Sequence, residues 1–241
     1  MIIEGIDTER VGAAVFDLGG VFLAGGVESV REFGDRHGLT PEAWQTIRRD
    51  LFADDTGLWS AVERGQATFA DFVARLRALA RGHGCDISEA DARNFMGNTG
   101  AAPTQRLRTE IVAAAARIRA RMPTALLTNN IPEWRDAWRS LIDVERLFDV
   151  VVDSSEVGMR KPEPAIYELT RDHLGIAHAS IFFLDDLGVN LKPARALGWQ
   201  TLRYDDTARV LAVLDALAAG RPQGRTAPRG GDAEVPRAHR K

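Results

Sequence analysis

Four short polar motifs, in a fixed order along the chain, carry residue types suited to chemistry on an anionic group. The first is Asp17, which follows the apolar run of residues 13–16 and comes shortly before Gly19 and Gly20. A carboxylate at such a strand end can bind a cation or attack phosphorus, and glycines let backbone N–H groups approach an anion. This motif alone is a weak signal, because many α/β proteins carry a structural aspartate at a strand end.

The other three motifs lie further along the sequence. Thr128 and Asn129 end a second apolar run and offer a hydroxyl and an amide that can hydrogen-bond phosphoryl oxygens. Lys161 stands just before a proline, and Asp185 with Asp186 forms an acidic pair at the end of another apolar run. Each motif also has a purely structural reading, so their joint presence and order indicate the site.

These motifs need a scaffold that brings strand ends together. Helical patterns separate five short apolar runs, which are predicted strands: Ala13–Asp17, Thr124–Thr128, Asp149–Asp153, Ile181–Asp185 and Gln200–Tyr204. Such strands, joined by helices, are typical of a parallel sheet buried on both faces, whose ligands gather at the carboxyl ends of the strands. The sequence therefore predicts an α/β fold with a Rossmann-like parallel sheet and the motifs along one edge.

The interval between the first two predicted strands is too long for an ordinary crossover. Residues 22–103 are therefore predicted to form an inserted α-helical cap domain, and residues 1–21 and 104–218 the core. An alanine-rich helix from Pro103 through Arg121 is predicted to lead back into the sheet.

Two features of the predicted cap bear on the site. Thr68 with Asp71 predicts a capping box at the start of one cap helix. Trp59 and Glu63 are candidates to line the entrance to the site.

The end of the chain differs in composition from the rest. Residues 219–241 are predicted to be a disordered basic tail, because they are rich in Gly, Pro and Arg and lack large apolar residues other than Val235. The chain carries a net charge of −3 and the segment from Arg221 carries +4, so the remainder carries −7. No aromatic residues interleave the basic ones, so we expect no nucleic-acid partner.

The cysteine count and the hydropathy of the sequence predict the cellular compartment. Cys85 is the one cysteine, so a disulfide framework is excluded within the chain. No signal peptide and no run as long as a membrane span is recognised, so we expect a cytoplasmic protein without a membrane partner. The sequence leaves the oligomeric state open.

Taken together, the four motifs resemble those of the haloacid dehalogenase-like hydrolase superfamily, in which a nucleophilic Asp, a Ser or Thr, a Lys and an acidic pair follow in this order. The stretches VGMRKPEPAIYEL and FFLDDLGVNLKPARALGW are most similar to the phosphatase domain at the N-terminus of soluble epoxide hydrolases and to related acyl-CoA dehydrogenase fusion proteins. The resemblance implies a phosphatase of small phosphorylated metabolites that uses Mg²⁺.

The resemblance also implies a role for each motif. Asp17 would attack phosphorus and form an aspartyl-phosphate, while Lys161, Thr128 and the Asn129 backbone would hold the transferring phosphoryl group. The implied Mg²⁺ ligands are oxygens of Asp17, Gly19 (main-chain carbonyl), Asp186 and Asp185. Asp185 is expected to support the site rather than to bind the ion, although the sequence leaves open which of the pair binds directly.

Gly19 departs from the pattern of the superfamily. Most of its phosphatases carry a second Asp two residues after the nucleophile, where it protonates the leaving group and later activates water. Losing such acid/base assistance costs about 10²–10⁴ in rate. Three readings follow: a phosphatase with another acid/base or with easily departing leaving groups, a non-catalytic module that binds metal or phosphate, and a dehalogenase. The acidic pair argues against the dehalogenase, because adjacent carboxylates repel one another without a cation.

Overall fold

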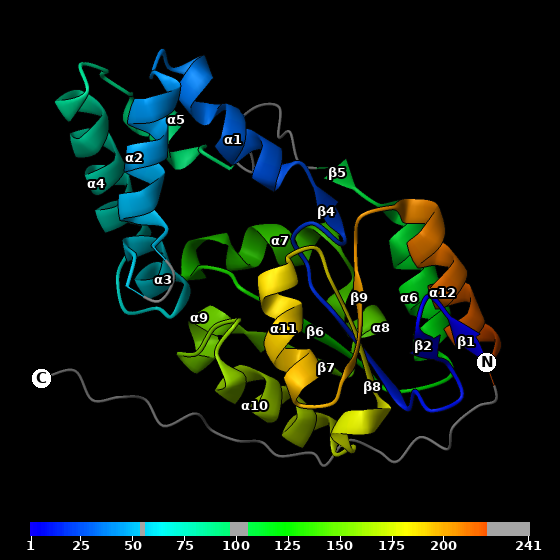
Figure 1. The fold of residues 1–241 in the computed structure, drawn as a ribbon. Helices are drawn as coiled ribbons and strands as arrows, with labels where there is room; N and C mark the ends of the chain where they lie inside the picture. The colour runs from blue at the N-terminus through cyan, green and yellow to red at the C-terminus, as the bar shows by residue number, and fades with distance from the viewer. Residues whose placement is uncertain (54–55, 97–105, 221–241) are drawn as a thin grey trace, which may run out of the picture.

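The computed structural model describes residues 1–53, 56–96 and 106–220 (Figure 1). Its centre is a parallel sheet in the strand order β7-β6-β3-β8-β9. These strands are β3 (Ala13–Phe16), β6 (Thr124–Thr128), β7 (Val150–Asp153), β8 (Ile181–Asp185) and β9 (Gln200–Arg203). The predicted α/β class with a Rossmann-like parallel sheet is confirmed, and all five predicted strands form, with ends shifted by one residue at most.

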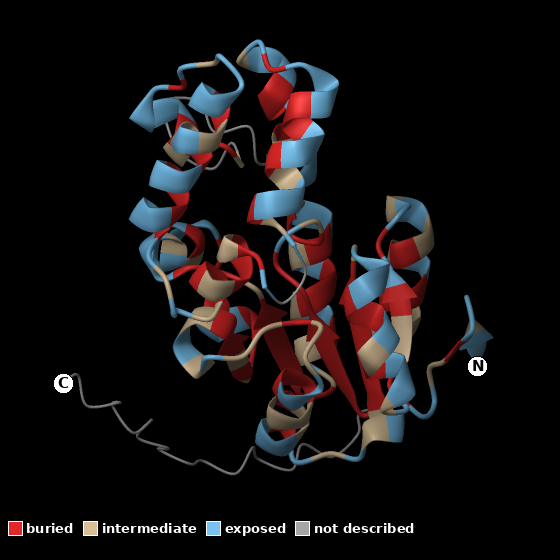
Figure 2. Cartoon of the chain, turned by 60° about the vertical axis from the view of Figure 1, so that its left-hand side comes forward, coloured by how far each residue is buried: buried red, intermediate tan, exposed pale blue. Residues whose placement is uncertain are grey.

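Successive residues of the central strands face opposite sides of the sheet, as strand geometry requires. In β3, Ala14 and Phe16 pack with α6 (Thr109–Arg119), α8 (Val144–Leu147) and α12 (Thr207–Ala219). Ala13 and Val15 face the other side, where α10 (Pro164–Leu174) and α11 (Gly188–Ala196) lie. The strands are therefore buried on both faces, which explains their near-continuous apolar sequence (Figure 2).

Five of the described helices lie between residues 26 and 93 and share a separate apolar cluster. They are α1 (Gly26–Arg36), α2 (Pro41–Leu51), α3 (Leu58–Glu63), α4 (Phe69–Gly82) and α5 (Glu89–Arg93), and we call this set the cap. The predicted capping box is present at the start of α4, where Thr68 and Asp71 exchange hydrogen bonds. The division into a core and a cap domain at the stated boundaries stays a prediction.

A two-stranded antiparallel ribbon joins the cap to the core, and it corrects one prediction. β4 (Leu23–Ala24) pairs with β5 (Arg106–Leu107), so the predicted helix from Pro103 does not include these residues and begins at Thr109. The sequence did not reveal this pairing because its partners lie more than eighty residues apart. Residues 103–105 lie outside the described residues.

The remaining elements are short. β1 (Ile2–Ile3) and β2 (Ile6–Asp7) form a hairpin that the sequence analysis missed. Irregular turns and short helices connect the core elements: η1 (Pro132–Trp134), α7 (Arg135–Leu141), α9 (Ser154–Val157) and η2 (His178–Ser180).

The end of the last helix and the hydropathy of the helices bear on two predictions. Helix α12 extends to Ala219, one residue past the predicted core boundary, and the rest of the predicted tail from Arg221 lies outside the described residues. Over the part of the chain that the structure describes, the helices are too short or too polar to cross a membrane.

Candidate active site

The four motifs meet at the carboxyl edge of the sheet because β3 lies between β6 and β8. Asp17 follows β3 directly, and its backbone N–H donates to the Leu184 carbonyl at 2.9 Å, which continues the pairing with β8. The Asp17 side chain turns back so that its Oδ1 accepts from the Leu18 N–H at 2.7 Å. The aspartate is therefore fixed both by the sheet and by the turn that follows it.

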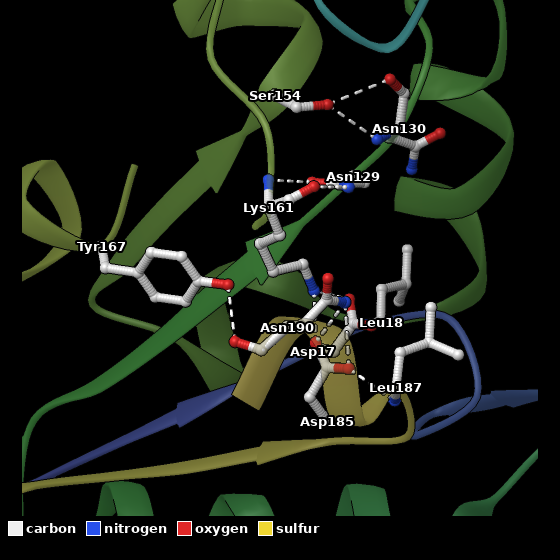
Figure 3. A network of polar contacts seen from close by, with 10 residues as sticks. All are labelled: Asp17, Leu18, Asn129, Asn130, Ser154, Lys161, Tyr167, Asp185, Leu187 and Asn190. Atoms are coloured by element: carbon white, nitrogen blue, oxygen red, sulfur yellow. Dashed lines mark hydrogen bonds and ion pairs between the residues drawn. The ribbon is translucent and has the colours of Figure 1, made fainter. Parts of the chain in front are cut away.

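Lys161 reaches this edge from the loop between α9 and α10 (Figure 3). Its Nζ lies 2.8 Å from Asp17 Oδ1 and 2.7 Å from Asp185 Oδ2, and the side chain is 1% exposed. The Asn129 amide binds the lysine backbone twice, accepting from its N–H at 2.8 Å and donating to its carbonyl at 2.9 Å. Burial thus holds one ammonium between two carboxylates from neighbouring strands.

Asp185 is saturated with donors and has no exposed surface. Besides Lys161, it accepts from the Leu187 N–H at 2.8 Å and from Asn190 Nδ2 at 3.1 Å on each oxygen. The Tyr167 hydroxyl donates to the Asn190 carbonyl at 2.7 Å and secures the start of α11 (Figure 3). With these donors in place, the first member of the acidic pair faces inward.

Asp17, Asp185 and Asp186 form the acidic cluster of the site. Each offers a carboxylate oxygen, and these oxygens lie within 4.8 Å of one another. When all three are ionised, Lys161 neutralises one of the three charges, so two negative charges remain. Hard divalent cations such as Mg²⁺ prefer one or two carboxylates together with carbonyl and water oxygens, and this donor set fits such an ion.

The pKa values reflect this crowding. Burial raises the pKa of Asp17, and Asp185 and Asp186 add to the rise, while Lys161 opposes it. Burial and then Asp185 raise the pKa of Asp186 to about 6. Burial by itself would lower the pKa of Lys161, but Asp17 and Asp185 outweigh it and raise that pKa above its ordinary value. Lys161 therefore stays protonated.

A cavity of about 510 Å³ opens above the acidic cluster, between the sheet edge and the cap. The core lines it with Asp17, Lys161 and Asp186, among other residues. The cap contributes apolar side chains and two polar ones, and its lining residues include Phe52, Trp59, Ser60, Glu63 and Met96. The expected position of Trp59 and Glu63 beside the site is confirmed.

The structure divides the predicted site residues into two groups. Those that line the cavity are Asp17, Gly19, Asn129, Lys161 and Asp186. Thr128 and Asp185 are buried beside it and are not among the lining residues. A direct contact of Thr128 with a phosphoryl group therefore stays a prediction.

The adjacent glycines that follow Asp17 and Leu18 differ in their surroundings. A Cβ on Gly20 would lie 2.1 Å from the Asp186 carboxyl, and Gly20 has a φ of +70°. Only glycine permits this close approach of the turn to the acidic pair. A Cβ on Gly19 would have no atom within 4 Å, so the position at which the sequence departs from the expected superfamily pattern is open space.

Sequence reasoning did not assign a role to three residues around the cavity. Asn190 lies on the first turn of α11 and binds Asp185, and an amide just after an acidic strand end was the available signal. Arg108 donates to the Gly20 carbonyl at 2.5 Å and so holds the glycine turn. Arg160, next to Lys161, pairs with Glu63 of the cap. Arg108 and Gly20 lie 88 positions apart in the sequence, and Arg160 and Glu63 lie 97 positions apart. Neither contact therefore produces a local sequence pattern.

Cap and core touch through two ion pairs on either side of Lys161. Arg160 Nε lies 2.6 Å from Glu63 Oε2, and Arg64 NH2 lies 2.5 Å from Glu163 Oε1. Each pair joins one residue at the end of α3 to one residue of the loop that carries the lysine. The cap wall of the cavity is therefore anchored to the same loop as the site ammonium.

The sequence is similar to known sequences. Residues 11–198 match a family model described as haloacid dehalogenase-like hydrolase. The chain is 30% identical over 218 residues to bifunctional epoxide hydrolase 2 of Rattus norvegicus, covering 84% of this chain and 38% of that protein. It is 30% identical over 211 residues to acyl-CoA dehydrogenase family member 10 of Mus musculus, covering 85% and 19%. The chain thus spans less than two fifths of these curated relatives.

Solved structures share the fold. A haloacid dehalogenase family enzyme of Bacteroides thetaiotaomicron, in complex with magnesium and inorganic phosphate, superposes with a TM-score of 0.58 at 23% identity and covers 83% of this chain and 98% of that one. An L-2-haloacid dehalogenase of Xanthobacter autotrophicus superposes with a TM-score of 0.57 at 20% identity, covering 89% and 85%. At these identities the likeness establishes the fold alone.

Proposed function

The chain belongs to the haloacid dehalogenase-like hydrolase family, and we propose that it is a Mg²⁺-dependent phosphatase of small phosphorylated metabolites. One observation carries this proposal: Asp17, Asp186 and Lys161 line one cavity, and the buried Asp185 beside it shares the Lys161 ammonium with Asp17. A divalent cation would offset the two negative charges that remain when all three carboxylates are ionised. A cytoplasmic location and the absence of nucleic-acid and membrane partners stay predictions from the sequence.

In this proposal Asp17 is the nucleophile. Its carboxylate attacks phosphorus, the bond to the leaving oxygen breaks, and water then hydrolyses the aspartyl-phosphate. Lys161, fixed against Asp17 and Asp185, stabilises the negative charge of the transferring oxygens. Asn129, which orients the lysine backbone and lines the cavity, would hold the phosphoryl group together with Thr128.

Asp17, Asp186 and the Gly19 carbonyl would hold Mg²⁺, because all three residues line the cavity. The ion would offset the repulsion between the anionic nucleophile and the phosphate. The oxygens of Asp185 already accept hydrogen bonds from Lys161, Leu187 and Asn190. Asp185 would therefore support the site by holding Lys161 in position rather than by binding the ion.

Gly19 favours one alternative, a non-catalytic module that binds metal or phosphate. Such a module would keep the cation ligands and lose the acid/base group, and no atom lies within 4 Å of the position of a Gly19 Cβ. Dehalogenase activity is less well supported although dehalogenases share the fold, because an uncompensated acidic pair would repel a departing halide.

Phosphate release from an aryl and an alkyl monoester, with Mg²⁺ and with a chelator, tests the proposal. We expect wild-type turnover with Mg²⁺ and a loss of more than about 10³-fold in Asp17→Asn, since the amide cannot act as the nucleophile. Asp172→Asn, at an exposed carboxylate on α10, is the matched control and should keep full activity.

The outcomes separate the candidates. Mg²⁺ binding by calorimetry without release from either ester would favour the binding module. Halide release from a 2-haloacid that needs no Mg²⁺ would favour the dehalogenase.

A further inference from the structure

The cap places one carboxyl group at the cavity that the proposed chemistry has not yet used. Glu63, at the end of α3, lines the same cavity as Asp17, Lys161 and Gly19, and it is 6% exposed. Among the described residues of the cap, it is the only carboxylic acid that lines this cavity. We propose that Glu63 is the acid/base of the reaction. It substitutes for the aspartate that most phosphatases of the superfamily carry at the position of Gly19.

The contacts of Glu63 fix its two oxygens differently. Oε2 accepts from Arg160 Nε at 2.6 Å, and Oε1 accepts from Trp59 Nε1 at 2.8 Å. A proton is disfavoured on Oε2 because a cation binds it, whereas the indole that binds Oε1 is neutral. Oε1 therefore carries the transferable proton, and Trp59 and Arg160 hold the carboxyl group in one orientation.

The surroundings of Glu63 also act on its pKa. Burial raises the pKa of Glu63, and it outweighs Arg160, Trp59 and Lys161, all of which lower that pKa. The neighbouring Arg64 pairs with Glu163 of the core and is not among the main groups that lower the pKa of Glu63. A carboxyl group with a raised pKa is suited to give a proton in one step and to take one in the next.

Gly19 and Glu63 line the same cavity as Asp17. A Cβ on Gly19 would meet no atom within 4 Å, so the turn leaves open space beside Asp17. A leaving group bound in this cavity would therefore find a carboxyl group on the cap and none at position 19. The cap therefore supplies a carboxyl group that the turn after Asp17 does not contain.

The proton balance is complete without another reactant. As Asp17 attacks phosphorus, the electron pair of the breaking P–O bond goes to the leaving oxygen, which takes the proton from Glu63 and departs as an alcohol. Water then attacks the phosphorus of the aspartyl-phosphate and gives a proton to the Glu63 carboxylate. The P–O bond to Asp17 breaks, its electron pair returns to the carboxylate, and phosphate leaves.

This assignment rests on the proposed phosphatase activity, so its test must distinguish the role of Glu63 from that activity. Comparing esters with different leaving groups does this. An aryl oxide departs with little help, whereas an alkoxide needs a proton. We expect Glu63→Gln to lower kcat/KM for the alkyl ester by about 10²–10⁴-fold and for 4-nitrophenyl phosphate by less than about 10-fold. Gly19→Asp in the Glu63→Gln background should restore alkyl hydrolysis by at least about 10-fold, because it places a carboxyl group in the open space.

Glu163→Gln is the matched control, because it breaks the other ion pair between cap and core but does not line the cavity. It should change both esters by the same factor. An equal loss on both esters in Glu63→Gln, or no rescue by Gly19→Asp, would overturn the assignment while leaving the phosphatase intact. If the wild-type protein hydrolyses neither ester, the proposed function fails and this inference fails with it.

A second measurement does not depend on turnover. Infrared spectra of the Mg²⁺-loaded protein should contain a protonated-carboxyl band that persists above the ordinary titration range of glutamate. The difference spectrum between the wild type and Glu63→Gln should contain this band, and identical spectra for the two proteins would contradict the inference.

Discussion

Lys161 and Asp185 form an ion pair of 2.7 Å in which the lysine side chain is 1% exposed and the aspartate side chain is fully buried. The same ammonium lies 2.8 Å from Asp17. The lysine is thus both a structural bridge between β3 and β8 and the cation beside the proposed nucleophile.

Removing this ammonium should destabilise the protein. Lys161→Met leaves two buried carboxylates without their cation, and we expect a loss of about 3–5 kcal/mol in the free energy of unfolding. Chemical denaturation with a chelator present measures it. Asp50→Asn, which breaks the exposed pair with Arg75, should cost less than about 1 kcal/mol. Equal losses in the two variants would contradict the role of burial.

We expect alanine substitution at Gly20 and at Gly19 to have different effects on stability and on Mg²⁺ binding. Gly20→Ala forces a Cβ into the Asp186 carboxyl at a φ of +70°, so we expect a loss of about 1–2 kcal/mol in stability. Displacement of that carboxylate should weaken Mg²⁺ binding by about 10- to 100-fold. Calorimetry of Mg²⁺ binding checks this. Gly19→Ala, whose Cβ meets nothing, is the control and should bind Mg²⁺ as the wild type does.

Asp186 should make the metal-free protein less stable as pH rises. Its pKa is about 6 in the fold, above the ordinary value of 3.8, so the folded state holds the proton more tightly than the unfolded state. The stability that this contributes is full below about pH 4 and is lost as pH rises through about 6. With a chelator at about pH 8, Asp186→Asn should therefore be more stable than the wild type by up to about 3 kcal/mol.

Thermal unfolding at two pH values measures this effect. The advantage of Asp186→Asn should vanish below about pH 4, where the wild-type carboxyl group is protonated. A variant that is less stable than the wild type at about pH 8 without metal would show that the charge of Asp186 is compensated within the protein.

The capping box of α4 should contribute measurably to the stability of the cap. Thr68→Ala removes the acceptor of the Asp71 N–H, a bond of 3.1 Å, and should cost about 0.5–2 kcal/mol. Thr46→Ala is the control, because the exposed Thr46 hydroxyl only donates back to the Glu42 carbonyl within α2. Its effect should be near zero or slightly stabilising. Equilibrium denaturation followed by circular dichroism compares them.

Local sequence patterns were enough to predict the individual strands and helix starts. The apolar runs Thr124–Thr128 and Ile181–Asp185 became strands with the predicted bounds, because residues buried on both faces of a sheet leave a continuous apolar pattern. Thr68 and Asp71 became a capping box because both partners lie within one turn. These signals are short-range and can be read without the fold.

Tertiary packing determines which of these elements meet. The strand order places Asp17 between the strand that ends at Thr128 and the strand that ends at the acidic pair, and burial turns Asp185 toward Lys161 while Asp186 lines the cavity. Arg160 and Glu63 lie 97 residues apart, and their pairing follows from the way the cap packs on the core. No periodicity or motif encodes such a contact, because it depends on the packing of whole elements.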